Sequence, residues 1–188
     1  VTYNTLTQTP FLEDMFNEWE KKRADSGKPM SKTPPKYPMH TEKKYSVVGT
    51  ESVPKPTENE TRTTLDDYQS ANGQILWAAR QTKVECAYAT SVNSRLMSVG
   101  GNAAMDSAMQ CIHYMHSTRH RGIRFRSDGC DQITAKYDAA LDPDVKDGKS
   151  MGGWSIKLFG GPISCLSKKM AHTAVSSTHR LNIRYRRV

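Results

Sequence analysis

The chain has 188 residues, of which 36% are hydrophobic and 24% are charged, and its formal net charge at pH 7 is +8. This length suffices for one medium domain, or for a small domain with long extensions. No apolar run approaches the ~20 residues that a membrane-spanning helix requires, so the sequence predicts no transmembrane segment. The basic balance favours a polyanionic partner, such as nucleic acid or an anionic membrane surface; a basic protein without such a partner is the alternative.

The four cysteines, Cys86, Cys111, Cys130 and Cys165, are widely spaced. None of them forms a CxxC motif or a Cys/His pair at zinc spacing, so we predict no metal site and expect free thiols in a reducing compartment. No signal or transit peptide is visible. The first residue is Val1, which either a removed organellar presequence or a simple sequence boundary would explain.

The first predicted element is a short amphipathic helix over residues 11–23, inside an N-terminal segment of residues 1–27. Its apolar face is predicted to hold Phe11, Met15, Phe16 and Trp19. Residues 28–64 are rich in Pro, Lys, Thr, Glu and Ser, and have too few apolar side chains to offset the entropy of ordering. We expect an extended linker there, which becomes ordered only against neighbouring proteins.

Residues 65–120 are predicted to be helical. A helix capped by Asp66 or Asp67 runs to Arg80, and a less regular run follows over residues 84–97. The third helix has the clearest three- and four-residue spacing, in Met105, Ala108, Met109, Ile112, Met115 and His116. A methionine-rich stripe of this kind is typical of core packing rather than of a cofactor site.

From residue 121 to residue 188 the apolar period changes to two. Strands are predicted for residues 122–126, 132–137, 154–159, 163–167 and 171–176, with a turn at Gly160 and Gly161. The predicted fold class is therefore α+β: a helical segment followed by an antiparallel meander, with a long irregular N-terminal extension.

Motifs spread over nearly the whole chain occur in an order that matches one known family. They are Leu6-Thr-Gln8, Pro29-Met-Ser-Lys-Thr-Pro34, Tyr68-Gln-Ser-Ala-Asn-Gly-Gln-Ile-Leu-Trp77, Thr82-Lys-Val-Glu-Cys-Ala-Tyr-Ala89, Ser94-Arg95, Gly122-Ile-Arg-Phe125 and Lys136-Tyr-Asp-Ala-Ala-Leu141. In this order they resemble LSQ, PVSTP, YRSLVGSLLW, TRPDIAYA, SR, GIRF and YSDADW of copia-type long-terminal-repeat retrotransposon polyproteins. The resemblance runs from the end of the reverse-transcriptase region into a degenerate, truncated ribonuclease H domain, and it implies a ribonuclease H-like meander.

The resemblance also indicates which catalytic acids are lost. Ribonuclease H chemistry uses several carboxylates to hold two Mg²⁺ ions. Asp138 matches the first aspartate of the family motif, whereas Ala140, His179 and Leu181 stand where the family has acids. A leucine cannot bind magnesium, so we expect a pseudoenzyme without catalytic residues, metal or cofactor.

Two groups of arginines are candidate nucleic-acid-binding residues, because they could neutralise phosphates without reading sequence. One group lies between the third helix and the first strand, and the other lies at the C-terminus: Arg119, Arg121, Arg124 and Arg126, then Arg180, Arg184, Arg186 and Arg187. Alternation in Arg124-Phe125-Arg126 predicts arginines on one strand face and the aromatic ring on the other. Salt bridges to acidic protein neighbours are the alternative role.

Together these features predict a non-catalytic, retrotransposon-derived architectural subunit of a large assembly. The expected host is a mitochondrial or other organellar ribosome, with rRNA contacted through phosphates and protein neighbours through the 28–64 linker. A supernumerary subunit of a respiratory or photosynthetic membrane complex is one alternative. A divergent ribonuclease H acting on RNA–DNA hybrids is the other. An intracellular location outside organelles is the fallback.

Overall fold

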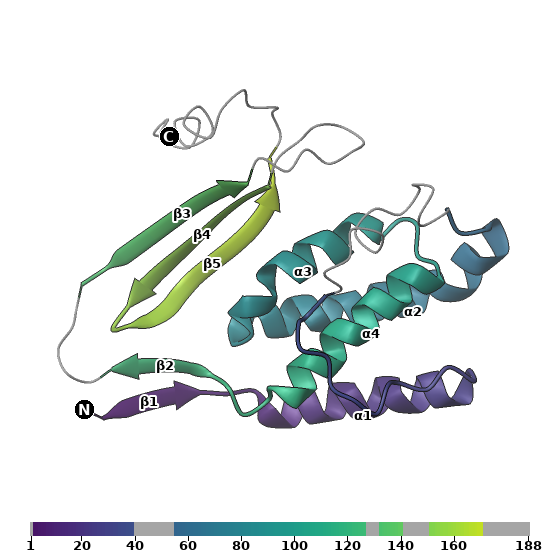
Figure 1. The fold of residues 1–188 in the computed structure, drawn as a ribbon, viewed down its shortest axis with the longest axis horizontal. Coiled ribbons are helices and arrows are strands. Elements are labelled where there is room, and N and C mark those ends of the chain that lie inside the picture. Colours follow the sequence, from purple (N-terminus) through teal and green to yellow (C-terminus); the bar gives the residue numbers. More distant parts are fainter. Residues whose placement is uncertain (1, 40–54, 127–131, 141–150, 171–188) are drawn as a thin grey trace. The chain divides into compact units, whose positions relative to one another are not determined.

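A computed structural model describes residues 2–39, 55–126, 132–140 and 151–170, and the chain divides into two compact units (Figure 1). The helical unit comprises Leu6–Ile123, and the strand unit comprises Val1–Thr5 with Arg124–Val188. The mixture of helices and small sheets confirms the α+β class predicted from the sequence. No helix in the described parts of the chain is long and apolar enough to cross a membrane.

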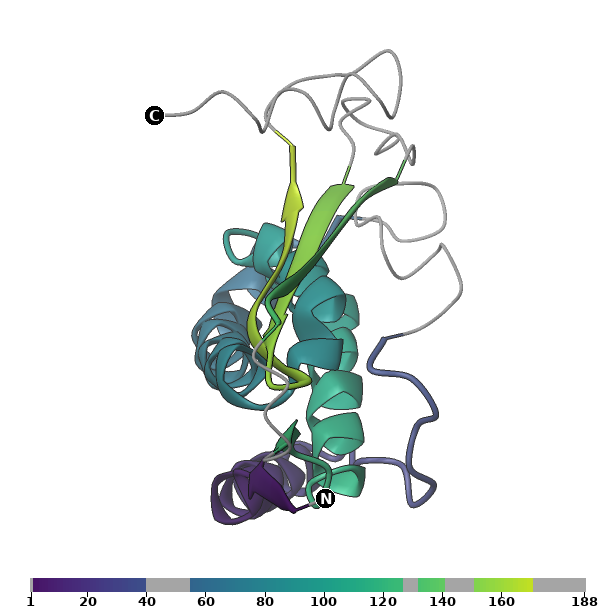
Figure 2. The same cartoon turned by 90° about the vertical axis from the view of Figure 1, so that its left-hand side faces the viewer.

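The described part of the helical unit contains four α-helices and two short 3₁₀ turns. These are α1 (Thr9–Asp25), α2 (Glu58–Gln81), η2 (Val84–Cys86), α3 (Ala87–Asn93), η3 (Ser94–Leu96) and α4 (Asn102–Ser117). Helix α4 packs against both α1 and α2, as the two views in Figures 1 and 2 show. The helical region that the sequence predicts is confirmed, apart from the boundaries discussed below.

Helix α1 confirms the predicted amphipathic helix and is two residues longer at each end. Pro10 stands in its first turn, where a missing backbone N–H costs nothing, and Lys22 and Arg23 complement the helix dipole in its last turn. The buried face consists of Leu12, Met15, Phe16 and Trp19. Phe11, predicted for that face, is only half-buried, and Leu12 replaces it.

Helix α2 begins earlier than the sequence predicted, inside the segment assigned to the linker. The Thr57 hydroxyl accepts a hydrogen bond from the Glu60 backbone N–H at 3.2 Å, which makes Thr57 the N-cap in place of Asp66 or Asp67. Glu58 and Glu60 place negative charge in the first turn, where the helix dipole favours it. These local interactions outweigh the polar composition of the segment.

The N-terminus of α4 is capped by α2 rather than by its own residues. Gly101 precedes α4 with φ +94°, a backbone conformation that favours glycine, and it has no side chain to cap the helix. The Glu60 carboxylate accepts from the Asn102 backbone N–H at 2.6 Å, and the Thr64 hydroxyl accepts from the Gly101 N–H at 2.8 Å. The two helices are therefore fixed to each other at this end.

The described part of the predicted linker, residues 28–39 and 55–57, is not independent of the helices. Met30 and Met39 pack against the helical core. The Gln110 side-chain amide donates to the Tyr37 carbonyl at 3.1 Å. This stretch of the extension thus lies on the chain's own helices, and its contact with neighbouring proteins stays a prediction. Residues 40–54 lie outside the described residues.

The core of the helical unit contains the predicted methionine stripe. Met105, Ala108, Met109, Ile112 and Met115 of α4 are all buried. Fully burying one such large apolar side chain contributes about 1.5–3 kcal/mol. Some buried polar groups in this core are paired: the Tyr68 hydroxyl donates to the Asn93 carbonyl at 2.6 Å, and the Ser107 hydroxyl donates to the Asn93 side-chain oxygen at 2.8 Å. The Asn72 side-chain oxygen and the Asn93 side-chain nitrogen are also buried, but they have no hydrogen-bond partner among the described residues.

The described strands form two small sheets. Strands β1 (Tyr3–Leu6) and β2 (Ile123–Arg126) pair with each other, and β3 (Thr134–Ala140), β4 (Met151–Leu158) and β5 (Gly161–Lys169) form an antiparallel meander in that order. Four of the five predicted strands are confirmed with shifted ends. The fifth, residues 171–176, lies outside the described residues, and β1 was not predicted.

The hairpin between β4 and β5 has a two-residue turn. Phe159 and Gly160 have φ of +51° and +75°, the sign that a type I′ turn requires at both positions, and Leu158 pairs with Gly161 across it. The turn therefore lies one residue before the predicted Gly160-Gly161 pair.

Candidate nucleic-acid interface

Strand β2 holds two of the predicted arginines, and glycines on both sides allow it to fit. A Cβ on Gly122 would overlap the Leu6 carbonyl oxygen and stand 2.8 Å from the Thr7 methyl group, so only glycine permits β1 to lie this close. A Cβ on Gly161 would lie 2.7 Å from the Arg124 carbonyl oxygen. The close contact with Leu6 explains on steric grounds why the Gly122-Ile-Arg-Phe125 motif begins with glycine.

The predicted alternation along β2 is confirmed. Ile123 is buried and Phe125 half-buried, whereas Arg124 and Arg126 are exposed. The Arg126 backbone N–H donates to the Phe159 carbonyl at 2.8 Å, which brings β2 to the β4–β5 turn. Both guanidinium groups therefore lie on the exposed side of a strand that is fixed at both ends.

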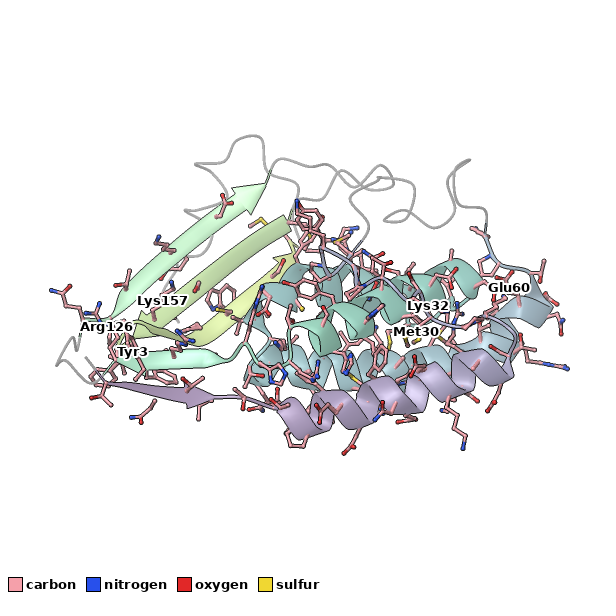
Figure 3. The ribbon with its side chains drawn as sticks, turned by 60° about the horizontal axis from the view of Figure 1, so that its bottom comes forward. Tyr3, Met30, Lys32, Glu60, Arg126 and Lys157 are labelled. Carbon is pink, nitrogen blue, oxygen red and sulfur yellow. The ribbon has the colours of Figure 1, made fainter. Side chains whose placement is uncertain are left out.

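Two further residues join these arginines at one end of the strand unit. Figure 3 shows Tyr3 of β1, Arg126 of β2 and Lys157 of β4 close to the same end. The Tyr3 ring is 51% exposed, and Lys157 is exposed as well. We call Tyr3, Arg124, Arg126 and Lys157 the basic cluster. In such a cluster the cations can bind phosphates, and the exposed aromatic ring can stack on a base.

Asp138 lies on the polar face of the meander. Side chains alternate between the two faces of a strand, so Asp138 shares its face with Lys136 of the same strand and with Ser155, the cross-strand partner of Lys136. On β5, Ser167 lies opposite Gly153, which itself pairs with Asp138. The opposite face carries the apolar cross-strand row Tyr137, Trp154 and Leu166.

Within the described strands this polar face has few oxygen ligands for a divalent cation. Asp138 is the single acidic residue of β3, β4 and β5, and lysines 136, 157 and 169 share its face. No group of three or more His, Cys, Asp or Glu side chains that could hold a metal ion occurs among the described residues. Positions 179 and 181 lie outside the described residues, and of Ala140 the structure describes only its place opposite Met151.

Of the other predicted arginines, the structure describes Arg119 and Arg121. Arg119 belongs to the helical unit, where its Nε donates to the Glu13 carboxylate at 2.8 Å and links α4 to α1. Arg121 is exposed in the same unit. The C-terminal group, Arg180, Arg184, Arg186 and Arg187, lies outside the described residues.

A buried lysine, which the sequence did not indicate, holds the end of α4. The Lys83 side chain is 0% exposed, and its ammonium group donates to the Thr118 carbonyl, to the Thr118 hydroxyl at 3.3 Å and to the Arg121 carbonyl at 2.9 Å. Burial lowers the pKa of Lys83, and the nearby Glu85 carboxylate opposes that shift. A cation at the last carbonyls of a helix stabilises its C-terminus.

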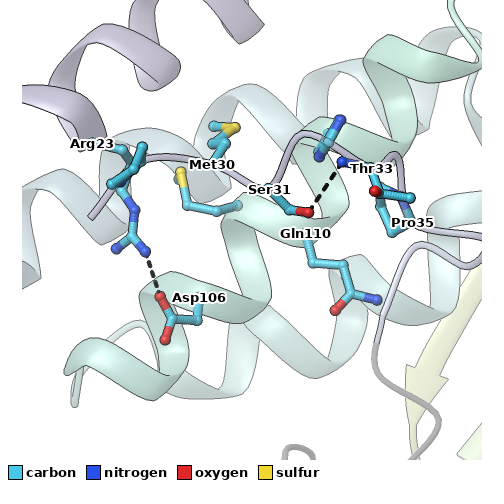
Figure 4. A pocket seen from close by; sticks show the side chains of 10 residues that line it. Arg23, Met30, Ser31, Thr33, Pro35, Asp106 and Gln110 are labelled. Carbon is cyan, nitrogen blue, oxygen red and sulfur yellow. Dashed lines mark hydrogen bonds and ion pairs between the residues drawn. The ribbon is translucent and has the colours of Figure 1, made fainter. Parts of the chain in front are cut away.

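A separate cavity in the helical unit has a volume of about 380 Å³ and lies between α1, α4 and residues 29–35 (Figure 4). At one side Arg23 Nη2 contacts Asp106 Oδ1 at 2.7 Å, so the two charges compensate each other. Its walls include Met30, Met109 and the nearly buried His113, whose pKa is lowered by burial and raised in part by Glu20. This ion pair therefore adds no net charge to the cavity.

Comparison with known proteins identifies a secreted effector protein and two transposon proteins as relatives. The chain is 32% identical over 111 residues to "Secreted RxLR effector protein 161" of Plasmopara viticola, covering 59% of this chain and 78% of that protein. It is 29% identical over 106 residues to "Putative transposon Ty5-1 protein YCL074W" of Saccharomyces cerevisiae, covering 56% and 34%. It is 28% identical over 174 residues to "Retrovirus-related Pol polyprotein from transposon TNT 1-94" of Nicotiana tabacum, covering 92% and 12%.

Two other comparisons gave no match. No protein-family model matches the chain, and no solved structure matches it.

Proposed function

Because the chain belongs to the copia-type retrotransposon polyprotein family, we propose that it is a non-catalytic scaffold that binds nucleic acid through its basic cluster. The chain spans only about an eighth of the tobacco polyprotein and a third of the yeast transposon protein, at 12% and 34% of their lengths. The activities of those whole proteins are therefore not carried over. What is proposed for this chain rests on its own residues.

The observation that carries the binding proposal is the convergence of Arg124, Arg126 and Lys157 with the exposed Tyr3 ring. Arginines two residues apart on a strand are separated by about 7 Å, so they can meet different phosphates of one backbone. Contacts of this kind position a protein on nucleic acid without specifying a sequence. The net charge of +8 supports a polyanionic partner.

The proposal that the ribonuclease H-like part no longer cuts is supported by the surroundings of Asp138. Two-metal catalysis needs several carboxylates around two cations. Within the described strands Asp138 shares its face with lysines 136, 157 and 169 and with no second acid. Positive side chains at those positions repel divalent cations and favour phosphate.

The host assembly is proposed from charge and sequence rather than from a contact in the structure. An organellar ribosome would supply rRNA phosphates to the basic cluster. A respiratory or photosynthetic complex is the alternative, in which the same cations would face acidic subunits or lipid headgroups. Purification of the chain from its source with its partners, followed by nuclease treatment, separates these two hosts, because only the first depends on RNA.

Fluorescence anisotropy with a labelled RNA–DNA hybrid tests the binding proposal. We expect the logarithm of the binding constant to fall linearly with the logarithm of salt concentration, with each lost phosphate contact reducing the slope by about 0.7–0.9. The triple variant Arg124→Gln, Arg126→Gln, Lys157→Gln should bind more weakly and with a smaller slope.

A matched control removes the same charge from the helical unit. Arg62→Gln, Arg80→Gln and Lys21→Gln replace two arginines and one lysine that are exposed on α1 and α2. This control should keep most of the affinity and the slope. Equal losses in the two triple variants would show that net charge, rather than the basic cluster, determines binding.

A further inference from the structure

The two edges of the meander differ in how they are protected against pairing with another strand. Strand β5 carries Pro162 and an irregular register opposite Ile156 and Lys157, both of which hinder further pairing. Among the described strands β3 forms the other edge, and it has no proline and no irregularity in its seven pairs with β4. Residues 134–138 of β3 are all exposed. An edge of this kind is a template for an added strand.

The charges on β3 determine which strand would fit. Lys136 and Asp138 lie on either side of Tyr137 and share one face. In an antiparallel pairing of β3 with a second β3, centred on Tyr137, Lys136 of each copy faces Asp138 of the other. Two charges of the same sign at these positions would face each other and repel a second copy. Here both cross-strand pairs are of opposite charge, which stabilises the pairing.

The opposite face of the same pairing is also compatible. Tyr137 is 48% exposed and belongs to the apolar row with Trp154 and Leu166. In the Tyr137-centred register the two Tyr137 side chains lie opposite each other, and aromatic cross-strand pairs are among the favourable ones. A shift by one residue would remove both this pair and the charge pairing, so the register is specified.

We propose that β3 is a self-association edge, and that two copies of the chain pair β3 with β3 antiparallel about Tyr137. The two three-stranded meanders then form one continuous sheet. The occupant is a second copy rather than an unrelated strand, because the charges at positions 136 and 138 complement themselves only in this arrangement. This inference does not depend on nucleic-acid binding by the basic cluster.

Sedimentation equilibrium of the full chain at concentrations from about 1 to 200 μM tests the proposal. We expect a reversible dimer, with a mass near twice the 21.1 kDa of one chain. The variants Lys136→Asp and Asp138→Lys each place like charges opposite one another, and each should raise the dimer dissociation constant at least tenfold, about 1.4 kcal/mol. The double variant, which exchanges the two charges, should restore dimerisation.

An equimolar mixture of the two single variants provides the most specific test. In that mixture Asp at position 136 of one variant faces Lys at position 138 of the other, and both pairs are again of opposite charge. We expect a heterodimer from two variants that are separately monomeric. Circular dichroism of each variant before mixing establishes that the fold is retained.

A cross-linking measurement stands independently of those charges. Tyr137→Cys should form a disulfide between copies under oxidised glutathione, because position 137 faces itself, whereas Thr134→Cys on the same strand should not. A monomeric wild type at 200 μM would overturn the proposal. So would a dimer that neither single variant weakens, a mixture that stays monomeric, or equal cross-linking at both cysteine positions.

Discussion

Replacing Lys83 by methionine should destabilise the helical unit, because the buried ammonium group holds the loop that follows α4. It donates to the carbonyls of Thr118 and Arg121. Hydrogen bonds to a charged donor contribute about 1.5–3 kcal/mol each, so the two together contribute roughly 3–6 kcal/mol. Removing the cost of burying a charge offsets part of that loss. We predict a net loss of about 2–3 kcal/mol in the free energy of unfolding.

Urea denaturation followed by tryptophan fluorescence measures this loss. The chain has three tryptophans, and Trp77→Phe with Trp154→Phe leaves Trp19, which is 1% exposed in the core of the helical unit, as the reporter. With a urea dependence of about 2 kcal/mol per molar, the Lys83→Met midpoint should fall by about 1–1.5 M. Lys21→Met, an exposed change on α1, should leave the midpoint nearly unchanged. An unchanged or higher midpoint for Lys83→Met would refute the bracing role of this lysine.

Three further predictions follow from the described contacts. Gly122→Ala should weaken the pairing of β1 with β2 and lower the melting temperature by several degrees, because the new methyl group would overlap the Leu6 carbonyl. Stability should fall as pH drops from about 7.5 to about 5.5, because burial lowers the pKa values of His113 and His116 and the unfolded chain then binds more protons; His113→Gln should reduce this dependence in urea titrations. Cys86 and Cys111 are both 0% exposed, and burial and their mutual contact raise the pKa of the Cys86 thiol, so neither should react with iodoacetamide until urea unfolds the chain, as mass spectrometry would show.

Each of these predictions has a matched control and an outcome that contradicts it. Gly73→Ala, in the exposed interior of α2 with open space around the new Cβ, should raise rather than lower stability; a gain for Gly122→Ala as well would contradict the steric argument. His120→Gln, at an exposed position, is the matched control for His113→Gln. Rapid alkylation of the native chain at Cys86 or Cys111 would show that this part of the core opens readily.

Much of the helical unit follows from local patterns in the sequence. The apolar spacing of α1 and α4 is regular enough to identify the buried faces, and these faces form the core. The start of α2 was missed although Thr57 and Glu60 have the spacing of a capping box. The polar composition of residues 28–64 favoured a linker. The Glu60 carboxylate also accepts a hydrogen bond from the N-terminus of α4, and this long-range contact, which the sequence does not show, stabilises the first turn of α2.

The functional residues were harder to predict because they depend on long-range contacts. Lysine is rarely buried, so nothing in the sequence distinguishes Lys83 from an exposed lysine. Tyr3 belongs to the basic cluster only because β1 pairs with β2, more than a hundred residues away. Arg119 lies in an arginine-rich stretch of the sequence, which suggested phosphate binding, but its guanidinium group contacts Glu13 of α1. Charge along the chain thus does not show which arginines form ion pairs within the fold.

The most direct test of the central claim is a cleavage assay on the substrate of the ancestral chemistry. Full-length chain is incubated with an end-labelled RNA–DNA hybrid and Mg²⁺ or Mn²⁺, and the products are separated on denaturing and native gels. The account predicts a retarded complex on the native gel and intact RNA on the denaturing gel. Cleavage of the RNA strand by the wild type that Asp138→Asn abolishes would contradict it.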